Sequence, residues 1–373
     1  MAVKIVRQTN RIAVLGAPVS AAALAPGGEG APAALRKAGL ISKLQSIGYE
    51  VADLGDDPQQ VFQPDNDSPR ARNLTRVLAA LQSLQPRVEV AAKSGALPLI
   101  LGGDCSIALA VVAGLRRYFR HVSVIYADCD ADLQTPATTQ SGCVDGMVVS
   151  HLAGRGASEL VRFWSEPPLV RDPDIALFGV ARLDPAEQKV LETSPLKRYM
   201  AEDVRRKGSR QAAREALERV HADAHEFVLH FDVDVIDGFQ ATNLPNVGGL
   251  RLDEVREALE VFAAEKHLAA IEVTGYNPLN DHDGSEAMLV IDLLAGMLTG
   301  RLNRSKDSGA EPVPAAASAE PTAPSAETAP VPVAPVTPGE GWSSDMLEAN
   351  ASEEGSSVES PEAPGLGDPE ERH

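Results

Sequence analysis

Residues 121–132 read HVSVIYADCDAD, an apolar run that ends in three aspartates. Such a run, rich in Val, Ile and Tyr, is typical of a buried strand. Residues 226–234, EFVLHFDVD, repeat the pattern with two aspartates, and residues 97–106, LPLILGGDCS, carry an aspartate and a cysteine after the apolar part. These three segments predict strands whose ends hold the residues best suited to chemistry.

Similar apolar runs continue outward along the chain, at residues 11–18, 49–56, 174–180 and 268–278. Between them lie stretches with apolar residues at helical spacing, at residues 30–48, 209–225 and 251–267. Strands that alternate with amphipathic helices predict an α/β fold with a mainly parallel sheet covered by helices on both faces. In such a sheet, binding sites lie at the carboxyl ends of the strands.

The composition changes abruptly near residue 308. From residue 311 to residue 373 the chain has 11 of its 27 prolines, 13 acidic residues and one basic residue. An acidic, Pro/Ala-rich segment without hydrophobic periodicity cannot bury enough apolar surface to offset its ordering entropy. We therefore predict a globular domain over residues 1–310 and a disordered acidic tail over residues 311–373.

Charge and composition restrict the partners and the compartment. The net charge of −19 argues against nucleic acid or an anionic membrane as a general partner. No apolar run approaches the roughly 20 residues of a spanning helix, and residues 1–16 lack the features of a signal peptide. The three cysteines are an odd number, which fits a reducing compartment. We expect a cytoplasmic protein that binds a small-molecule substrate.

The aspartates at the strand ends indicate a cation site. Residues two apart in an extended chain point the same way, so Asp128, Asp130 and Asp132 can share one face. Asp232 and Asp234 can share another. If these strand ends are neighbours, five carboxylates converge, and their repulsion must be relieved by cations or by raised pKa values. Hard divalent cations bound by oxygen ligands are the simplest solution.

Four motifs in order give the chain a family resemblance. GGDCS at residues 102–106 is similar to a GGDHS motif, and DCDAD at 128–132 is similar to DAHxD. DVDVIDG at 232–238 is similar to DVDxxDP, and GYNP at 275–278 is similar to ExNP. With these motifs the chain resembles the arginase–agmatinase (ureohydrolase) superfamily from about Arg11 to Leu302. The resemblance implies a three-layer α/β/α domain, a homo-trimer or homo-hexamer, and two manganese ions at the carboxyl edge of the sheet.

The resemblance also assigns roles to single positions, several of which are altered here. Six positions match metal ligands of the family, namely Cys105, Asp128, Asp130, Asp132, Asp232 and Asp234. At two of them, Cys105 and Asp130, the family usually has histidine. Asp145 stands where a histidine is credited with proton shuttling, and Gly275 stands where a glutamate pairs with the guanidinium. Three further positions match residues that contact the amino-acid end of arginine, namely Gln134, Ser141 and Asp184.

These changes alter the charge of the implied metal site. Two histidines and four carboxylates carry a charge of −4, which two divalent ions balance. With cysteine and aspartate at the histidine positions, the ligand charge becomes −5 with a neutral Cys105 thiol and −6 with a thiolate. A raised carboxylate pKa, a cationic ligand, or a single metal would relieve the excess. A thiolate also favours softer metals than manganese, so zinc and iron remain open.

Two functions follow as alternatives. The first is a metal-dependent hydrolase of a C–N bond in a linear amidine or guanidino compound, with arginine possible but not favoured. Asp145 would then protonate the departing nitrogen. The second is a catalytically lapsed member of the same family that acts as a binding or regulatory subunit. His230 precedes Asp232 by two residues, and we interpret it as a packing residue rather than a site residue.

Overall fold

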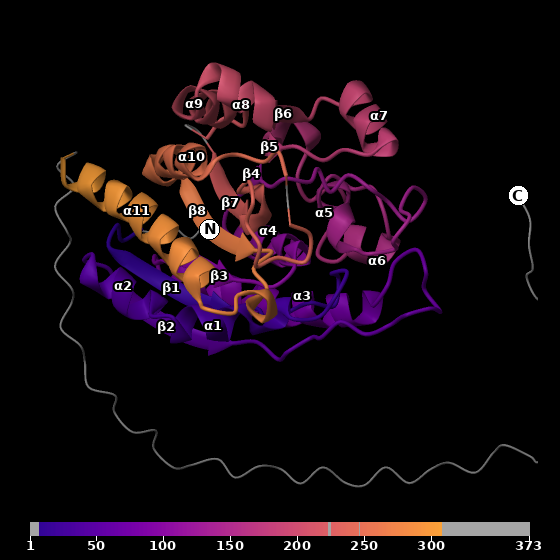
Figure 1. Cartoon of the computed structure of the whole chain (residues 1–373), viewed down its shortest axis with the longest axis horizontal. Helices are drawn as coiled ribbons and strands as arrows, with labels where there is room; N and C mark the ends of the chain where they lie inside the picture. Colours follow the sequence, from indigo (N-terminus) through magenta and orange to yellow (C-terminus); the bar gives the residue numbers. More distant parts are fainter. Residues whose placement is uncertain (1–6, 223–224, 246, 308–373) are drawn as a thin grey trace, which may run out of the picture. The chain divides into compact units, whose positions relative to one another are not determined.

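The computed structural model describes residues 7–222, 225–245 and 247–307 of the chain (Figure 1). The segment predicted to be a tail, residues 311–373, lies outside the described residues. Within them, the strands form one sheet in the order β2-β1-β3-β8-β7-β4-β5-β6, and all neighbouring strands are parallel. The predicted parallel sheet is thus confirmed. Its strands are β1 Arg11–Gly16, β2 Glu50–Asp56, β3 Leu97–Leu101, β4 Val122–Ala127, β5 Ile175–Val180, β6 Lys197–Met200, β7 Glu226–Asp232 and β8 Leu268–Thr274.

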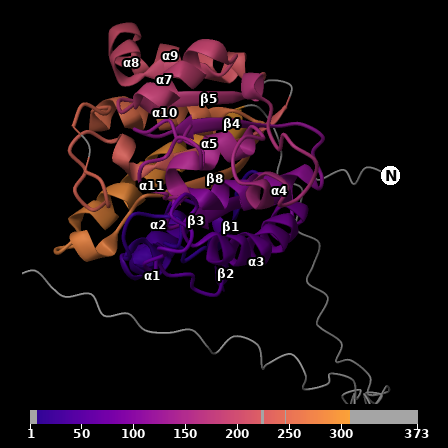
Figure 2. The same cartoon turned by 90° about the vertical axis from the view of Figure 1, so that its right-hand side faces the viewer.

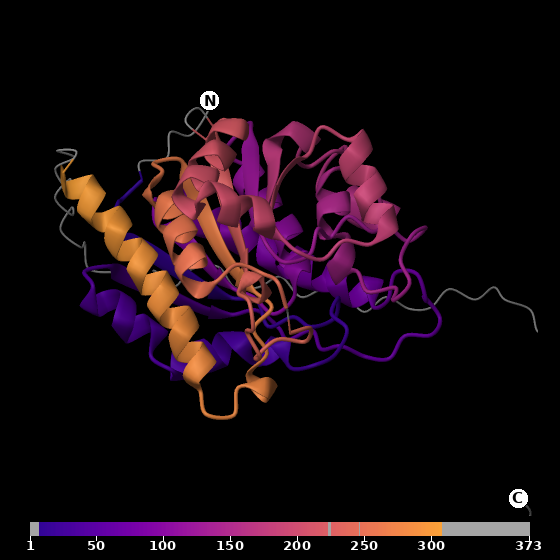
Figure 3. The same ribbon diagram turned by 45° about the horizontal axis from the view of Figure 1, so that its top comes forward.

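Helices cover both faces of the sheet, which confirms the three-layer α/β/α arrangement. The first layer packs on the face that holds Ile125 and Leu229 and consists of α1 Ala31–Lys37, α2 Leu40–Ser46, α8 Ala201–Lys207, α9 Ser209–Arg219, α10 Leu252–Ala264 and α11 Ser285–Asp307. The second layer packs on the opposite face and consists of α3 Leu74–Lys93, α4 Ala108–Arg116, α5 Val148–Leu152, α6 Ser158–Val161 and α7 Pro185–Thr193. In Figure 2 the labelled strands rise from β2 near the bottom to β5 near the top, in the order of the sheet. Figure 3 shows α11 beside α10.

Alternation along the central strands explains why both layers are held by apolar contacts. On β4, Ile125 packs in one core cluster, whereas Val124 and Tyr126 pack in the other. On β7, Leu229 and Val228 divide in the same way. Because side chains of a strand alternate between faces, an unbroken apolar run is the sequence that a sheet covered on both sides requires.

Two local features differ from the sequence expectations. The single helix expected over residues 30–48 is divided into α1 and α2, because Gly39 lies between them with φ of 98°, a value that favours glycine. The second difference is β6, a four-residue edge strand in which only Tyr199 is buried. Its polar sequence, KRYM, lacks the apolar signal that identified the other strands.

The topology brings the predicted chemistry to one edge of the sheet. β3, β8, β7 and β4 are consecutive neighbours, and all run in the same direction. Their carboxyl ends therefore meet at one edge, where Cys105, Asp128, Asp232 and Gly275 follow or end the four strands. Among the described residues, no helix is both long enough and apolar enough to cross a membrane.

Candidate metal centre

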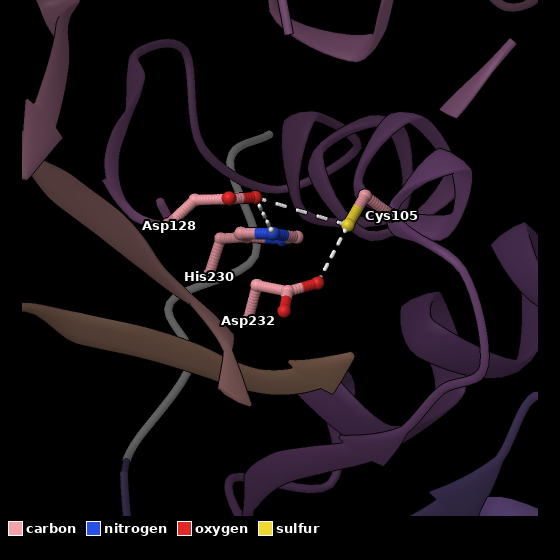
Figure 4. Close-up of side chains that lie close together, drawn as sticks. All are labelled: Cys105, Asp128, His230 and Asp232. Atoms are coloured by element: carbon pink, nitrogen blue, oxygen red, sulfur yellow. Dashed lines mark hydrogen bonds and ion pairs between the residues drawn. The ribbon is translucent and has the colours of Figure 1, made fainter. Parts of the chain in front are cut away.

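Four buried side chains converge beyond the ends of β3, β4 and β7. Cys105 Sγ lies 3.0 Å from Asp232 Oδ2 and 4.0 Å from Asp128 Oδ2. His230 Nε2 lies 3.8 Å from the same Asp128 oxygen. The ligand atoms of all four residues lie within 4.8 Å of one another. Figure 4 shows the four side chains pointing toward one another, with Cys105 opposite the other three.

Local backbone structure fixes the direction of these side chains. Asp232 ends β7 and caps the short 3₁₀ helix Val233–Val235, since its Oδ1 accepts a hydrogen bond from the Asp234 amide at 2.9 Å. Its other oxygen accepts a hydrogen bond from Thr274 Oγ1 at 3.0 Å. Cys105 begins a second 3₁₀ helix, Cys105–Ile107, which the Asp104 side chain caps. Short capped turns at strand ends thus aim the thiol and the carboxylate inward.

The close approach of the backbone beneath this cluster depends on glycine. A Cβ atom on Gly103 would lie 1.8 Å from the carbonyl oxygen of Val19, and the Gly103 carbonyl accepts a hydrogen bond from Gly275 N at 2.9 Å. Gly102 and Gly103 therefore let the loop after β3 pass against its neighbours.

His230 also lies in this cluster, although the sequence pattern was interpreted as that of a packing residue. The ring lies on β7 with Nδ1 2.8 Å from Glu272 Oε1, and both side chains are completely buried. It also stacks on Tyr126, with ring centroids 3.9 Å apart and an interplanar angle of 3°. A carboxylate on one ring nitrogen and metal ligands near the other is the arrangement typical of metal-binding histidines. The sequence signal for this position is the two-residue spacing between His230 and Asp232, because side chains two apart on a regular strand share a face.

A second group, adjacent to the first, shares Asp128 and adds Asp130 and Asp234. A positively charged side chain, Arg182, already contacts two of these carboxylates. Arg182 donates from Nε and a terminal nitrogen to the two Asp130 oxygens at 2.8 and 2.7 Å, and to Asp234 Oδ2 at 2.5 Å. A further hydrogen bond joins Arg182 to the Leu244 carbonyl at 3.0 Å. The sequence reasoning missed Arg182, although it lies just after an apolar strand, β5, where functional residues were expected.

The electrostatics of the site follow from burial and from mutual repulsion. Burial raises the pKa of Asp128 well above its usual range, and the charges of Asp232 and Asp130 add to the effect. Burial and neighbouring carboxylates likewise raise the pKa of the Cys105 thiol. Burial alone would lower the pKa of Arg182, but its hydrogen bonds to Asp130 and the charges of Asp234 and Asp130 outweigh this and raise it. The site therefore favours bound cations.

The two other carboxylates assigned to the site have different surroundings. Asp132 accepts a hydrogen bond from the Tyr126 hydroxyl at 2.5 Å, and burial raises its pKa well above the usual range. Asp145 is partly buried, and its Oδ1 accepts a hydrogen bond from the Cys105 amide at 2.7 Å. Desolvation raises the pKa of Asp145 to about 8, and the charge of Asp104 contributes.

A cavity of about 60 Å³ adjoins both groups. All six residues assigned to metal binding line it, together with Asp145 and Gly275. The three residues assigned to the amino-acid end of a substrate are not part of its lining. Gln134 Nε2 donates to Asp184 Oδ2 at 2.7 Å, Asp184 caps α7, and Ser141 Oγ accepts from the Cys143 amide at 3.1 Å.

The donor set decides which metals the residues fit. A tetrahedral zinc ion with S, N and O ligands would hold the ligand atoms about 3.4–3.6 Å apart. Cys105 Sγ lies 3.0 Å from Asp232 and 4.0 Å from Asp128, and His230 Nε2 lies 3.8 Å from Asp128, so these separations lie on either side of this spacing. The first group therefore fits one divalent ion. The second group does not fit another ion as it stands, because Arg182 already bonds to two of its three carboxylates.

The chain is similar to known arginases over nearly all of its described part. A family model described as "Arginase family" matches residues 10–299. The arginase of Bacillus subtilis (strain 168) is 30% identical over 293 residues, which cover 78% of this chain and 98% of the relative. The arginase of Bacillus caldovelox is 29% identical over 296 residues, which cover 78% and 99%.

The solved structures agree with the sequence comparisons. The native structure of the Bacillus caldovelox arginase at pH 5.6 superimposes with a TM-score of 0.71 at 28% identity, and the match covers 78% of this chain and 98% of that one. The family model, the length of the matches and the shared fold lead to one conclusion: this chain belongs to the arginase family.

Proposed function

We propose that the protein is a metal-dependent hydrolase that cleaves a C–N bond in a linear amidine or guanidino compound. The observation that carries this proposal is the acidic cavity beside the Cys105, Asp128, His230 and Asp232 cluster. A cavity lined by carboxylates attracts a cation, and amidines and guanidines are cations at neutral pH. Membership of the arginase family supports hydrolysis as the reaction class.

The residues of the site have separable tasks in this reaction. Cys105, Asp128, His230 and Asp232 would hold a divalent ion, which would supply Lewis acidity at the cavity when bound. Thr274 and Glu272 fix the orientation of Asp232 and His230 through their hydrogen bonds. We assign Asp145 to carry a proton to the departing nitrogen, because its carboxylate lines the cavity and the Cys105 amide holds it in place.

Arginine is not the substrate that this cavity favours. Gly275 has no carboxylate to pair with a guanidinium, and a Cβ atom there would lie 2.1 Å from Asp232 Oδ1. Without that partner, a guanidinium loses a charge-assisted hydrogen bond of about 1.5–3 kcal/mol. Gln134, Ser141 and Asp184 are bonded within the protein and lie outside the cavity lining, so an α-amino acid end is not selected there.

A panel of compounds tests the proposal directly. Full-length protein loaded with zinc, and separately with manganese, is assayed for urea, ammonia or amine release from guanidino and amidino compounds that differ at the far end. We expect turnover of at least one compound that lacks an α-amino acid end. We expect Asp145→Asn to reduce kcat by about 10²–10⁴-fold with little change in bound metal. No release from any compound by metal-loaded protein would overturn the proposal.

One observation favours a second candidate, a catalytically lapsed binding subunit. Arg182 neutralises Asp130 and Asp234, two carboxylates assigned to metal binding. In that case guanidino compounds would bind without release of any product. Equilibrium binding measured beside the turnover assay separates the two candidates.

A further inference from the structure

We propose that this site binds one divalent metal ion through Cys105, Asp128, His230 and Asp232, and that the guanidinium of Arg182 takes the place of a second ion. The inference deepens the proposed function and rests on the same site. It differs from the two-ion centre that the family resemblance implies, and it assigns His230 and Arg182 to roles that the motifs do not contain.

The first part rests on the surroundings of His230. Its Nδ1 is bound to Glu272, which lies on the neighbouring strand β8, so Nε2 is the nitrogen directed toward Asp128. The same nitrogen also lies 3.4 Å from Thr274 Oγ1, which makes a long hydrogen bond. Stacking on Tyr126 prevents the ring from tilting. The imidazole is therefore preorganised as a ligand, with Glu272 as its orienting carboxylate.

The chemistry of the four donors indicates a metal of the zinc class. A thiolate, an imidazole and two carboxylates make a mixed donor set, which suits zinc better than manganese or magnesium. Cys105 is buried, and its Sγ lies 3.0 Å from Asp232 Oδ2, so the sulfur is placed beside the carboxylates that would share the ion.

The second part rests on the geometry of Arg182. Its planar guanidinium spans Asp130 through two parallel hydrogen bonds and reaches Asp234 with a third. The loop after β5 holds it there, because the amides of Ala181 and Arg182 both donate to the Cys129 carbonyl, at 2.9 and 3.0 Å. The two carboxylates are thus paired with a fixed positive charge. A second divalent ion between them would lie beside this guanidinium and be repelled by it.

The same chain contains a matched control for Arg182. Arg36 bonds to both oxygens of Asp53, at 2.8 and 2.9 Å, and to Asp56 at 2.5 Å. This group has the same pattern of one bidentate and one single contact, but it lies outside the cavity lining. Arg36→Met therefore removes a comparable ion-pair group without freeing any carboxylate at the site.

The experiment is a cobalt titration of the full-length chain, followed by elemental analysis after removal of free metal. Wild-type protein should bind one Co²⁺ per chain with a thiolate-to-cobalt charge-transfer band, and Cys105→Ser should lose that band. His230→Gln should weaken binding by more than about tenfold, and Glu272→Gln by about 10–100-fold. His151→Gln, a change at another buried histidine, should leave binding unchanged.

The Arg182 variant gives the complementary result. Arg182→Met should bind two Co²⁺ per chain, because it removes the positive charge beside Asp130 and Asp234, whereas Arg36→Met should still bind one. Two tightly bound ions in the wild type would overturn the inference, as would none, or full binding in His230→Gln. If Arg182→Met does not fold, the stoichiometry of the wild type decides alone. One bound ion without turnover would refute only the proposed function, whereas turnover with two bound ions would refute only this inference.

Discussion

At the scale of single residues, we expect Asp232 to contribute most to metal binding. It lies closest to the Cys105 thiol, at 3.0 Å, and Thr274 orients it. Asp232→Asn keeps an oxygen for the Asp234 amide but removes the charge, so bound metal should fall by more than about tenfold. Elemental analysis of the purified protein measures this loss.

Asp184→Asn is the matched control for that change. Asp184 caps α7 and accepts from Gln134, and it lies outside the cavity lining. Asparagine is also a good N-cap, so the fold should persist. Metal content should equal that of the wild type. Equal metal content in wild type and Asp232→Asn would contradict the assignment of Asp232.

The residue scale also shows what the sequence alone can predict. The spacing of Asp128, Asp130 and Asp234 after apolar runs is enough to predict that they gather at one edge. The alternation of side chains along a strand cannot predict that Arg182 bonds to Asp130. The position of Arg182 depends on backbone hydrogen bonds from the loop after β5 to the Cys129 carbonyl. The strand pattern could have placed His230 on the same face as Asp232. Its orientation depends on Glu272, which is distant in sequence and is its neighbour only in the sheet.

At the scale of elements, the end of β8 limits what the site can accept. Gly275 has φ of 78°, and a Cβ atom there would meet the Asp232 carboxylate. Gly275→Ala should therefore cost more than the about 1–2 kcal/mol of a left-handed alanine, and should also weaken metal binding. Urea unfolding and a metal titration of the same preparation measure both effects.

Gly284→Ala separates the cost of a left-handed alanine backbone from the effect of a Cβ contact with Asp232. Gly284 has nearly the same φ, 76°, but no neighbouring atom lies within 4 Å of an added Cβ. This variant should show the backbone cost alone, with unchanged metal binding. If Gly275→Ala and Gly284→Ala behave alike, the contact with Asp232 does not restrict the site.

The elements also differ in how well the sequence predicts them. Buried strands such as β4 and β7 were found from continuous apolar runs, since both faces of the sheet are covered. The edge strand β6 was missed because only one of its side chains is buried, and edge strands commonly carry charged residues. The break at Gly39 was missed because apolar positions continue at helical spacing across it.

At the scale of the whole molecule, the described residues supply the sheet, both helical layers and the site. Residues 311–373 hold 11 of the 27 prolines and 13 acidic residues and have no hydrophobic periodicity, so the sequence predicts that they add no apolar core. Deletion of Glu311–His373 should therefore leave the midpoint and cooperativity of urea unfolding unchanged, within about 0.5 kcal/mol. A large loss of stability in the truncated protein would show that this segment takes part in the fold.

The number and position of the bound metal ions distinguish a one-ion site from a two-ion site. The most direct test is anomalous diffraction at the zinc edge from crystals of the full-length chain grown with excess zinc. A single-ion site predicts one peak, within bonding distance of Cys105 Sγ and His230 Nε2, with Arg182 still bonded to Asp130 and Asp234. Two peaks at the site, or a peak between Asp130 and Asp234 with Arg182 displaced, would contradict it.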